Sequence, residues 1–137
     1  MSEEVLSLQL VENLVQECTK YNLEGLDKLD QFSTKELAGI YNGTGADWMP
    51  EKARKALDFI SKDLLPIVLI HDVEFKIGGS REDFYQANER LRRNGDKVAR
   101  AKYGWWRLRR YRLIAQANLF ADICHVAGWV AFNHTEE

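Results

Sequence analysis

A histidine followed directly by an aspartate, His71-Asp72, stands in the most apolar stretch of this 137-residue chain. Each side chain needs a partner there, because burying a polar group unpaired costs roughly 1–3 kcal/mol. Histidine is the most common general base near neutral pH, and a carboxylate is a usual ligand of a hard cation such as calcium. A hydrogen-bonded structural pair without chemistry is the alternative interpretation of the same two residues.

A second stretch that could do chemistry is IYNGTGADWMP, residues 40–50, with two glycines, an asparagine and a threonine. It is either a plain turn or a loop that brings backbone groups close to a ligand. Glycine lets carbonyls turn inward without strain, and an oxygen-rich loop beside a carboxylate suits calcium. Adjacent side chains on a helix point about 100° apart, so His71 and Asp72 are expected to face two different neighbours.

The Y-x-G-x-G pattern and the downstream H-D pair resemble the phospholipase A2 superfamily, in particular its small, cysteine-poor bacterial and phage members. The resemblance covers residues 41–94, including a Gly-Gly turn and the helix that follows it. In that family a glycine-rich loop supplies three backbone carbonyls to calcium, and the aspartate beside the catalytic histidine completes the site. The resemblance implies calcium ligands at Tyr41, Gly43, Gly45 and Asp72.

The same resemblance implies that His71 is the general base and that the Gly43 N–H helps to hold the oxyanion. Asn88 stands where the family has the aspartate that orients the histidine, and Phe75 stands where it has a tyrosine. Asparagine can fix the ring by accepting one imidazole proton, but it cannot stabilise the imidazolium that forms. The corresponding change in a serine-protease triad costs about 10⁴ in rate. Both a slow enzyme and an inactive protein stay open.

Two further departures concern the scaffold. The cysteines that commonly flank the loop and the dyad are Thr44 and Leu69, and an extra helix over residues 51–62 separates the two motifs. The insertion is expected to be tolerated, since lengthening a surface connection costs little entropy.

Helical periodicity predicts an all-α protein, a small domain of about five to six helices with the glycine-rich loop before the central helix. Ser33 with Glu36, and Ser80 with Asp83, mark two helix starts. The stretch LLPIVLIHDVEFKI could be a strand or a helix, and we expect a helix because no second strand is available to pair with it. The expected helices are 4–20, 34 onward, 51–62, 64–77, 81–94 and 105–132, with turns at Gly95 and Gly104.

We expect a single domain over residues 1–137, in three regions with different charge. Residues 1–36 form an acidic helical region, 37–94 the phospholipase A2-like core, and 95–137 a basic and aromatic helical region. Between Leu91 and Arg112 there are nine Lys or Arg residues and one acid, although the formal net charge of the chain is only −2. The basic block is therefore a local feature.

Tryptophan and tyrosine alternate with arginine in this block, and three interpretations compete. The basic block could be a solvent-exposed helix face whose aromatic residues pack into the core. It could instead be a surface that binds anionic lipid, or one that binds nucleic acid or an acidic protein. We predict exposed arginines, with Tyr111 and one of the two tryptophans packed inside. The candidate lipid or partner surface is Trp105, Trp106, Arg107, Arg109, Arg110 and Arg112.

Cys18 and Cys124 are expected to be buried, reduced thiols, and we place the protein in the cytoplasm. No run of 18 apolar residues is present, so we expect no membrane span. His125 is expected to be a hydrogen-bonded core residue, and His134 to lie in a frayed tail.

Two functions from different classes follow. The first is a phospholipase A2-like protein that hydrolyses a phospholipid ester with calcium, using His71, Asn88 and Gly43. The alternative is a non-catalytic interaction or inhibitor protein, of phage or bacterial origin, that keeps the fold and binds a protein partner through its basic face. We expect a phospholipid or membrane surface or a protein as partner, and no nucleic acid, because no nucleic-acid-binding module is visible.

Overall fold

The computed structural model describes residues 2–43 and 61–135. In these ranges the chain forms six α-helices and no β-strand, which confirms the predicted all-α class. The helices are α1 (Glu3–Lys20), α2 (Leu26–Leu29), α3 (Thr34–Gly43), α5 (Leu65–Ile77), α6 (Arg81–Lys102) and α7 (Leu108–Ala127), with short 3-10 turns at η2 (Lys62–Leu64) and η3 (Gly128–Val130). The helix expected over residues 51–62 and the proposed ligand Gly45 fall largely or wholly outside the described residues.

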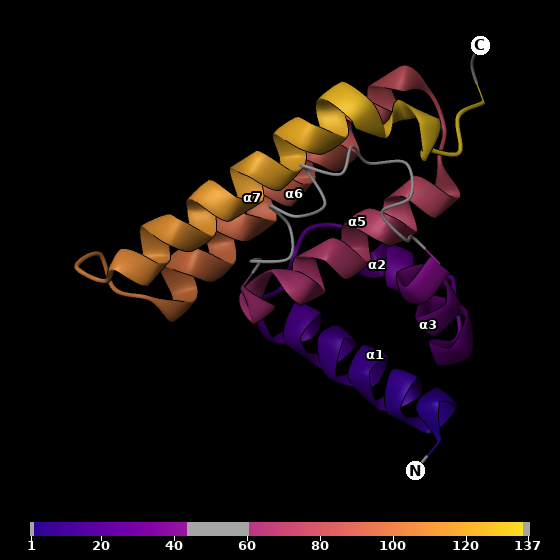
Figure 1. Ribbon diagram of the computed structural model, residues 1–137, viewed down its shortest axis with the longest axis horizontal. Helices are drawn as coiled ribbons and strands as arrows, with labels where there is room; N and C mark the ends of the chain where they lie inside the picture. The colour runs from indigo at the N-terminus through magenta and orange to yellow at the C-terminus, as the bar shows by residue number, and fades with distance from the viewer. Residues whose placement is uncertain (1, 44–60, 136–137) are drawn as a thin grey trace.

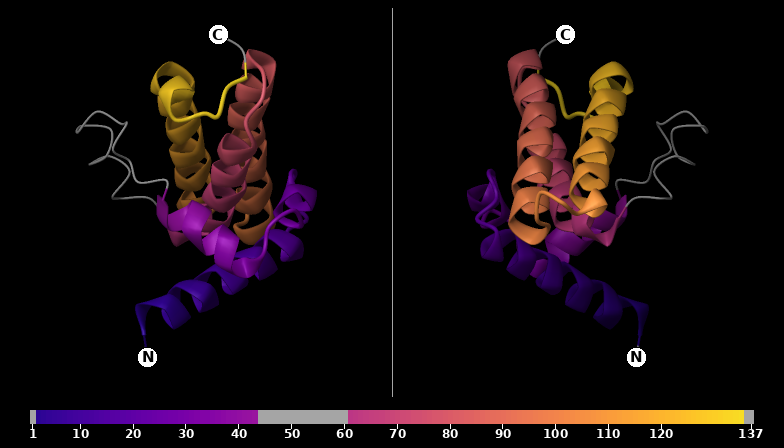
Figure 2. Two further views of the ribbon diagram at one scale, coloured as in Figure 1. Left: turned by 90° about the vertical axis from the view of Figure 1, so that its right-hand side faces the viewer. Right: turned by 90° about the vertical axis from the view of Figure 1, so that its left-hand side faces the viewer.

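The two longest helices, α6 and α7, run side by side as an antiparallel pair, and their connection projects from one end of the molecule (Figure 1). Helix α5 packs against α6, while α1, α2 and α3 contact α5. The two side views show α1 crossing beneath the other helices (Figure 2). Helix α5 is therefore the central element against which the N-terminal helices and the long pair are assembled.

Burial of almost every side chain explains why α5 is so apolar. Nine of its residues are buried, among them the apolar Ile67, Leu69 and Val73. Pro66 lies in its first turn, where a missing N–H is tolerated. The stretch that could have been a strand is thus a helix, as predicted, since its backbone groups are satisfied within the segment.

Glycines end α5 because the chain must turn back sharply. Gly78 and Gly79 both have positive φ, at 73° and 136°. A Cβ on Gly78 would lie 1.8 Å from the carbonyl oxygen of Asn133, so no larger residue fits there. The C-terminal segment is fastened at this turn, since the Asn133 N–H donates to Phe75 O at 3.0 Å and Gly79 pairs with His134 in an isolated bridge. The prediction that His134 lies in a frayed tail was therefore wrong.

Both predicted capping boxes are present. The Ser33 hydroxyl accepts from the Glu36 N–H at 3.1 Å, and the Glu36 carboxylate accepts from the Ser33 N–H at 3.0 Å. Ser80 and Asp83 make the equivalent pair at the start of α6. Each box satisfies backbone donors that have no partner within the helix, which is why the serine positions fix both helix starts.

A buried carboxylate joins three helices. Glu74 of α5 pairs with Lys28 of α2 at 3.2 Å and with Arg90 of α6. Burial raises the pKa of Glu74, and the two cations act in the opposite direction. Gly25 lies against the same place with φ of 88°, and a Cβ there would come within 2.8 Å of Ile70 Cγ2. Glycine at this position therefore lets the chain before α2 approach α5 closely.

Cys18 and Cys124 are both free thiols in buried positions, as expected. The Cys18 Sγ–H donates to the Pro66 carbonyl at 3.3 Å, and burial raises the pKa of this thiol to about 12. A neutral thiol of this kind is a packing residue rather than a nucleophile.

One helical segment in the described part of the chain, Leu108–Val130, has the length and composition needed to cross a membrane. The core helix of a water-soluble protein can meet the same criterion. Here α7 lies along α6 and buries one face against the rest of the fold, through Leu113, Ala117, Phe120, Ala121 and Cys124. We therefore describe α7 as a packed helix.

The prediction of a turn at Gly95 was wrong, because Gly95 lies inside α6. The residue is buried, and a Cβ built on it would lie 2.3 Å from the Cβ of Ala117 on α7. Glycine is used here for the close approach of two helices, and α6 continues for seven further residues to Lys102. The predicted turn at Gly104 is present between α6 and α7.

This contact gives a stability prediction. Gly95→Ala should destabilise the fold by about 1–3 kcal/mol through overpacking, even though alanine favours a helix by about 1 kcal/mol. The matched control is Gly39→Ala in α3, where a Cβ meets no described atom within 4 Å and should be neutral or stabilising. Urea denaturation measures both. Equal stability of the two variants would contradict the close contact at Gly95.

Candidate functional site

The structure brings His71 of α5 and Asn88 of α6 into direct contact. His71 Nε2 and Asn88 Oδ1 are 2.8 Å apart, although the residues are 17 positions apart in the chain. Asn88 has no exposed surface, so water does not compete for the contact. Sequence reasoning placed Asn88 beside His71 by resemblance, and the two residues do meet. Whether they take part in a reaction is a separate question.

The contact defines the tautomer of the ring. Because the Asn88 oxygen faces Nε2, that nitrogen carries the proton and donates it, which leaves the lone pair on Nδ1. Nδ1 has no hydrogen-bond partner within residues 2–43 and 61–135. A neutral imidazole that is held through one nitrogen and carries a lone pair on the other is the form required of a general base.

Aromatic rings surround the imidazole and make its environment apolar. The ring centroid of His71 lies 4.2 Å from that of Phe75 and 5.7 Å from that of Phe120 on α7. Only 3% of the residue is exposed. Burial lowers the pKa of His71 to about 4, and the hydrogen bond with Asn88 opposes this change only in part. The imidazole is therefore neutral at pH 7 and is a weak base.

Asp72 faces a different part of the fold, as expected for adjacent positions on a helix. Its charge adds to the effect of burial in raising the pKa of the Tyr41 hydroxyl at the end of α3. It also adds to the effect of burial in raising the pKa of the Cys124 thiol on α7. The charge of the buried Asp72 carboxylate thus acts on the C-terminal ends of both α3 and α7.

The end of α3 differs from the expected loop. Tyr41 and Gly43 belong to the last turn of the helix, so a loop can begin only after Gly43. Gly45 and Thr44 lie outside the described residues. The last four carbonyls of an α-helix accept no hydrogen bond from an N–H of the same helix, and the helix dipole gives this end a partial negative charge. The carbonyls of Tyr41 and Gly43 thus belong to the last turn of α3, whose carbonyls do not accept from a later N–H of the same helix.

The chemistry of the oxygen ligands proposed here indicates which metal ion they could hold. They are a carboxylate and backbone carbonyls, all hard oxygen ligands, which fits calcium and would not favour a softer metal. Within the described ranges there is no group of three or more His, Cys, Asp or Glu side chains that could hold a metal. A calcium site here would therefore depend on Asp72 as its charged ligand and on backbone oxygens for most of its coordination.

Sequence reasoning did not assign Phe120 and Cys124 of α7 to the site. Both are buried and one helical turn apart, and they border His71 and Asp72 respectively. The spacing Leu113, Ala117, Phe120, Ala121, Cys124 marks a buried helix face, but it does not say which helix that face covers. The contribution of α7 could have been found only from the three-dimensional arrangement.

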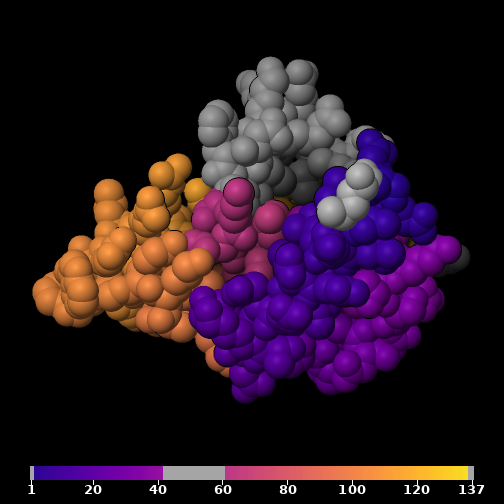
Figure 3. Space-filling model, turned by 90° about the horizontal axis from the view of Figure 1, so that it is seen from below, coloured from indigo at the N-terminus to yellow at the C-terminus, as the bar shows by residue number. Residues whose placement is uncertain are grey.

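The basic surface is more exposed than predicted. Trp105 and Trp106 are 72% and 71% exposed and Tyr111 is 50% exposed, so the prediction of a buried Tyr111 and one buried tryptophan was wrong. The reason is that the α6–α7 connection extends beyond the body of the fold (Figure 3). The Tyr111 hydroxyl donates to the Trp105 carbonyl at 2.7 Å across this connection. Of the four arginines, Arg107, Arg109 and Arg112 are exposed and Arg110 is half-buried.

The other two histidines lie outside this site. His125 is exposed on α7 with its ring 4.9 Å from that of Tyr85, which corrects the expectation of a core residue. His134 stacks on Trp129 at 4.4 Å. Exposure of His125 follows from its place beside Cys124, which takes the buried face of α7.

No match to the chain was found among protein-family models, curated proteins or solved structures. The geometry of the described residues is therefore the basis for the functional conclusions that follow.

A buried neutral His71 should make stability depend on pH. The unfolded chain takes up a proton at this residue below about pH 6.5, whereas the folded protein does so only at about pH 4. Acid therefore favours the unfolded state. Because of His71, the free energy of unfolding should fall by on the order of 3 kcal/mol as the pH is lowered from about 6.5 to about 4. The measurement is urea denaturation at several pH values, comparing wild type with His71→Gln.

The exposed His125→Gln is the control, and it should keep the pH dependence of the wild type. A His71→Gln protein that folds and shows the same loss of stability toward acid would contradict a neutral, buried His71.

Proposed function

We propose that the protein is a slow phospholipase A2-like hydrolase, with His71 as the general base in cleavage of a phospholipid ester. The observation that supports this is the 2.8 Å contact between His71 Nε2 and Asn88 Oδ1. It fixes the ring in the tautomer with a lone pair on Nδ1. The same residues match the histidine and the orienting position of the family that the sequence resembles.

In this mechanism Nδ1 of His71 takes a proton from water as the water oxygen attacks the ester carbonyl carbon. Nε2 keeps its proton and its hydrogen bond to Asn88, so the ring does not rotate during the transfer. The imidazolium then returns the proton to the leaving alkoxide oxygen, and a carboxylic acid and an alcohol are released. Asn88 orients the ring without compensating its positive charge, and the Phe75 and Phe120 rings exclude water that could do so. A low rate follows.

Calcium, when bound, would polarise the ester carbonyl and stabilise the developing oxyanion. Asp72 and the carbonyls of Tyr41, Gly43 and Gly45 would hold it. Because Gly43 is the last residue of α3, its N–H would help to hold the oxyanion only after leaving its hydrogen bond within the helix. What supports this assignment is the oxygen-only donor set, together with the position of Tyr41 and Gly43 in the last turn of α3, where the charge of Asp72 acts on Tyr41.

Asn88→Asp is the sharpest test of this proposal. A carboxylate beside Nε2 favours the protonated imidazole and raises its pKa, so calcium-dependent hydrolysis of mixed phospholipid micelles should be at least about tenfold faster. His71→Ala should remove the activity, and calcium chelation should remove it in both wild type and Asn88→Asp. Asn13→Asp, on the exposed face of α1, is the control and should leave the rate unchanged.

If Asn88→Asp folds normally and is no faster, or if His71→Ala keeps the rate of wild type, the hydrolase proposal fails.

The exposed surface at the α6–α7 connection supports a second candidate function. We infer that a protein without hydrolytic activity would act through this surface, because two adjacent tryptophans are exposed there beside four arginines. A protein interface concentrates its binding energy in a few aromatic or arginine anchors, whereas a lipid surface uses arginine charge and indole insertion together.

Sedimentation with vesicles separates these two uses of the surface. A lipid-facing surface should bind anionic vesicles at low salt, bind neutral ones weakly, and lose affinity by about tenfold in Trp105→Ala/Trp106→Ala. Val126→Ala, an exposed apolar residue toward the other end of α7, is the control. If wild type ignores anionic vesicles at low salt, the interaction-protein alternative is preferred.

A further inference from the structure

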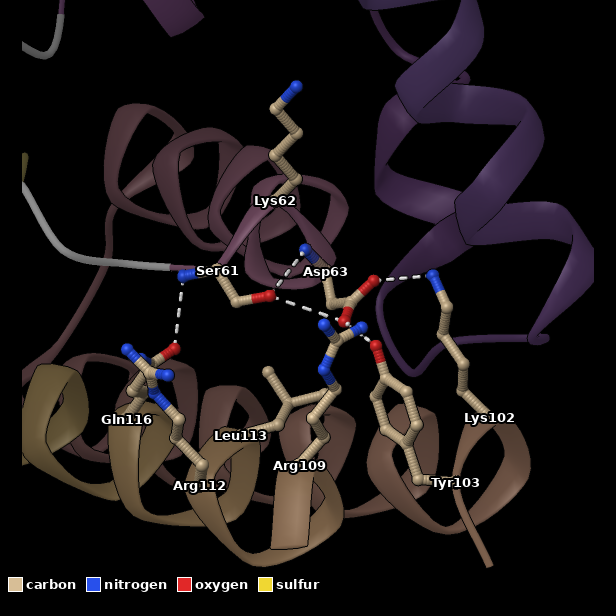
Figure 4. A pocket seen from close by; sticks show the side chains of 9 residues that line it. All are labelled: Ser61, Lys62, Asp63, Lys102, Tyr103, Arg109, Arg112, Leu113 and Gln116. Carbon is tan, nitrogen blue, oxygen red and sulfur yellow. Dashed lines mark hydrogen bonds and ion pairs between the residues drawn. The ribbon is translucent and has the colours of Figure 1, made fainter. Parts of the chain in front are cut away.

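A pocket of about 590 Å³ lies where η2 meets the end of α6 and the start of α7 (Figure 4). Its lining contains four cationic side chains and a single carboxylate, together with a hydroxyl, a phenol and an amide. None of these residues belongs to the His71 site. The lining residues are Ser61, Lys62, Asp63, Lys102, Tyr103, Arg109, Arg112, Leu113 and Gln116.

The carboxylate in this pocket is already satisfied within the fold. Asp63 accepts from the Tyr103 hydroxyl at 2.6 Å and from the Ser61 hydroxyl at 3.2 Å, and it forms an ion pair with Lys102. Burial opposes its ionisation, but these hydrogen bonds lower its pKa. The Ser61 N–H donates to Gln116 Oε1 at 3.0 Å and ties η2 to α7. Asp63 and Lys102 therefore neutralise each other and give the pocket a fixed polar wall.

The two arginines are not neutralised in this way. Arg109 lines the pocket beside Tyr103 and forms no ion pair with any carboxylate in the described residues. Arg112 has neither a hydrogen bond nor an ion pair within residues 2–43 and 61–135. Two guanidinium groups one helical turn apart therefore face one pocket, and no carboxylate among the residues that the structure describes balances both.

The start of α7 adds to this positive potential. Its first turn has no acidic residue, and Arg107 provides no side-chain cap. A helix N-terminus is the positive end of the helix dipole, where acidic side chains or bound anions are favoured and arginines are not. Placing several arginines at this end costs stability in the free protein, and a bound anion would offset that cost.

Figure 4 shows how these side chains are directed. The Arg109 guanidinium extends toward the Asp63 and Tyr103 side of the pocket, and the Arg112 guanidinium lies beside Gln116. Lys62 extends away from the others, so it is left out of the binding set. The cationic groups available to a ligand are thus Arg109 and Arg112.

We propose that this pocket binds the phosphate group of an organic phosphate, held by Arg109 and Arg112. Guanidinium groups pair with phosphate through two parallel hydrogen bonds, and two of them match the charge of a phosphomonoester dianion. The volume is that of a small-molecule site and exceeds what phosphate alone would fill. The satisfied polar wall of Asp63, Tyr103 and Gln116 is suited to hydroxyl groups on the remainder of the ligand. The phosphate could belong to a free metabolite or to a lipid headgroup.

Calorimetry of the full chain with glycerol 3-phosphate tests the soluble source. We expect measurable binding in wild type, and affinity at least about tenfold lower in Arg112→Gln and in Arg109→Gln. The control is Arg100→Gln on α6, which removes an equal charge from an exposed residue outside both the pocket and the tryptophan–arginine surface, and it should change the affinity by less than about twofold. All of these arginines are exposed, and circular dichroism verifies that each variant is folded.

Sedimentation with phosphatidylcholine vesicles, with and without phosphatidic acid, tests the lipid source. Binding that requires phosphatidic acid and falls about tenfold in Arg112→Gln, but not in Arg100→Gln, supports a headgroup ligand. The proposal is overturned if wild type binds neither probe, or if Arg100→Gln weakens binding as much as the two pocket variants do. These measurements are independent of hydrolysis, so an inactive His71 site would not affect their outcome.

Discussion

The burial of three polar side chains in one central helix is the constraint on which the rest of the fold depends. His71, Asp72 and Glu74 of α5 are all buried, and each would destabilise the fold if it lacked a partner. Because they point in different directions, their interactions involve different helices. His71 contacts Asn88 on α6, the charge of Asp72 acts on groups of α3 and α7, and Glu74 pairs with cations of α2 and α6. The surrounding helices are thus positioned by polar contacts as well as by apolar packing.

Local patterns in the sequence predicted much of this fold. Capping boxes at Ser33 and Ser80 depend on residues three positions apart, so they could be read directly. The Gly78-Gly79 turn followed from a similar short-range rule, whereas the helical form of α5 was expected because the sequence offers no second strand to pair with it. The contact of His71 with Asn88 could be expected only because the sequence resembles a family in which the two positions meet.

The failures share a physical cause, which is that long-range packing can override local preference. Gly95 looked like a turn, but its missing Cβ serves the approach of α7. Tyr111 and one of the two tryptophans were expected in the core, but the α6–α7 pair extends past the part of the fold that could cover them. Helical periodicity predicted the face of α7 that borders His71, but it did not predict which residues that face would contact.

The structure separates the neutral His71 from a cationic end of the molecule. His71 is uncharged among phenylalanine rings, whereas the arginines at the start of α7 are exposed to solvent and to the pocket beside η2. Helix α7 contributes to both, through Phe120 and Cys124 in its C-terminal half and Arg109 and Arg112 near its start. A ligand or surface bound at the cationic end would thus contact the same helix that borders the buried histidine.

The central claim is that His71 is a neutral imidazole with its proton on Nε2, donated to Asn88, and a lone pair on Nδ1. Nitrogen-15 NMR of the histidine side chains across a pH titration measures this directly. The account predicts a protonated Nε2 and an unprotonated Nδ1 for His71, unchanged on acidification until near pH 4. A neutral His71 with the proton on Nδ1, or a His71 that titrates near pH 6.5, would contradict it.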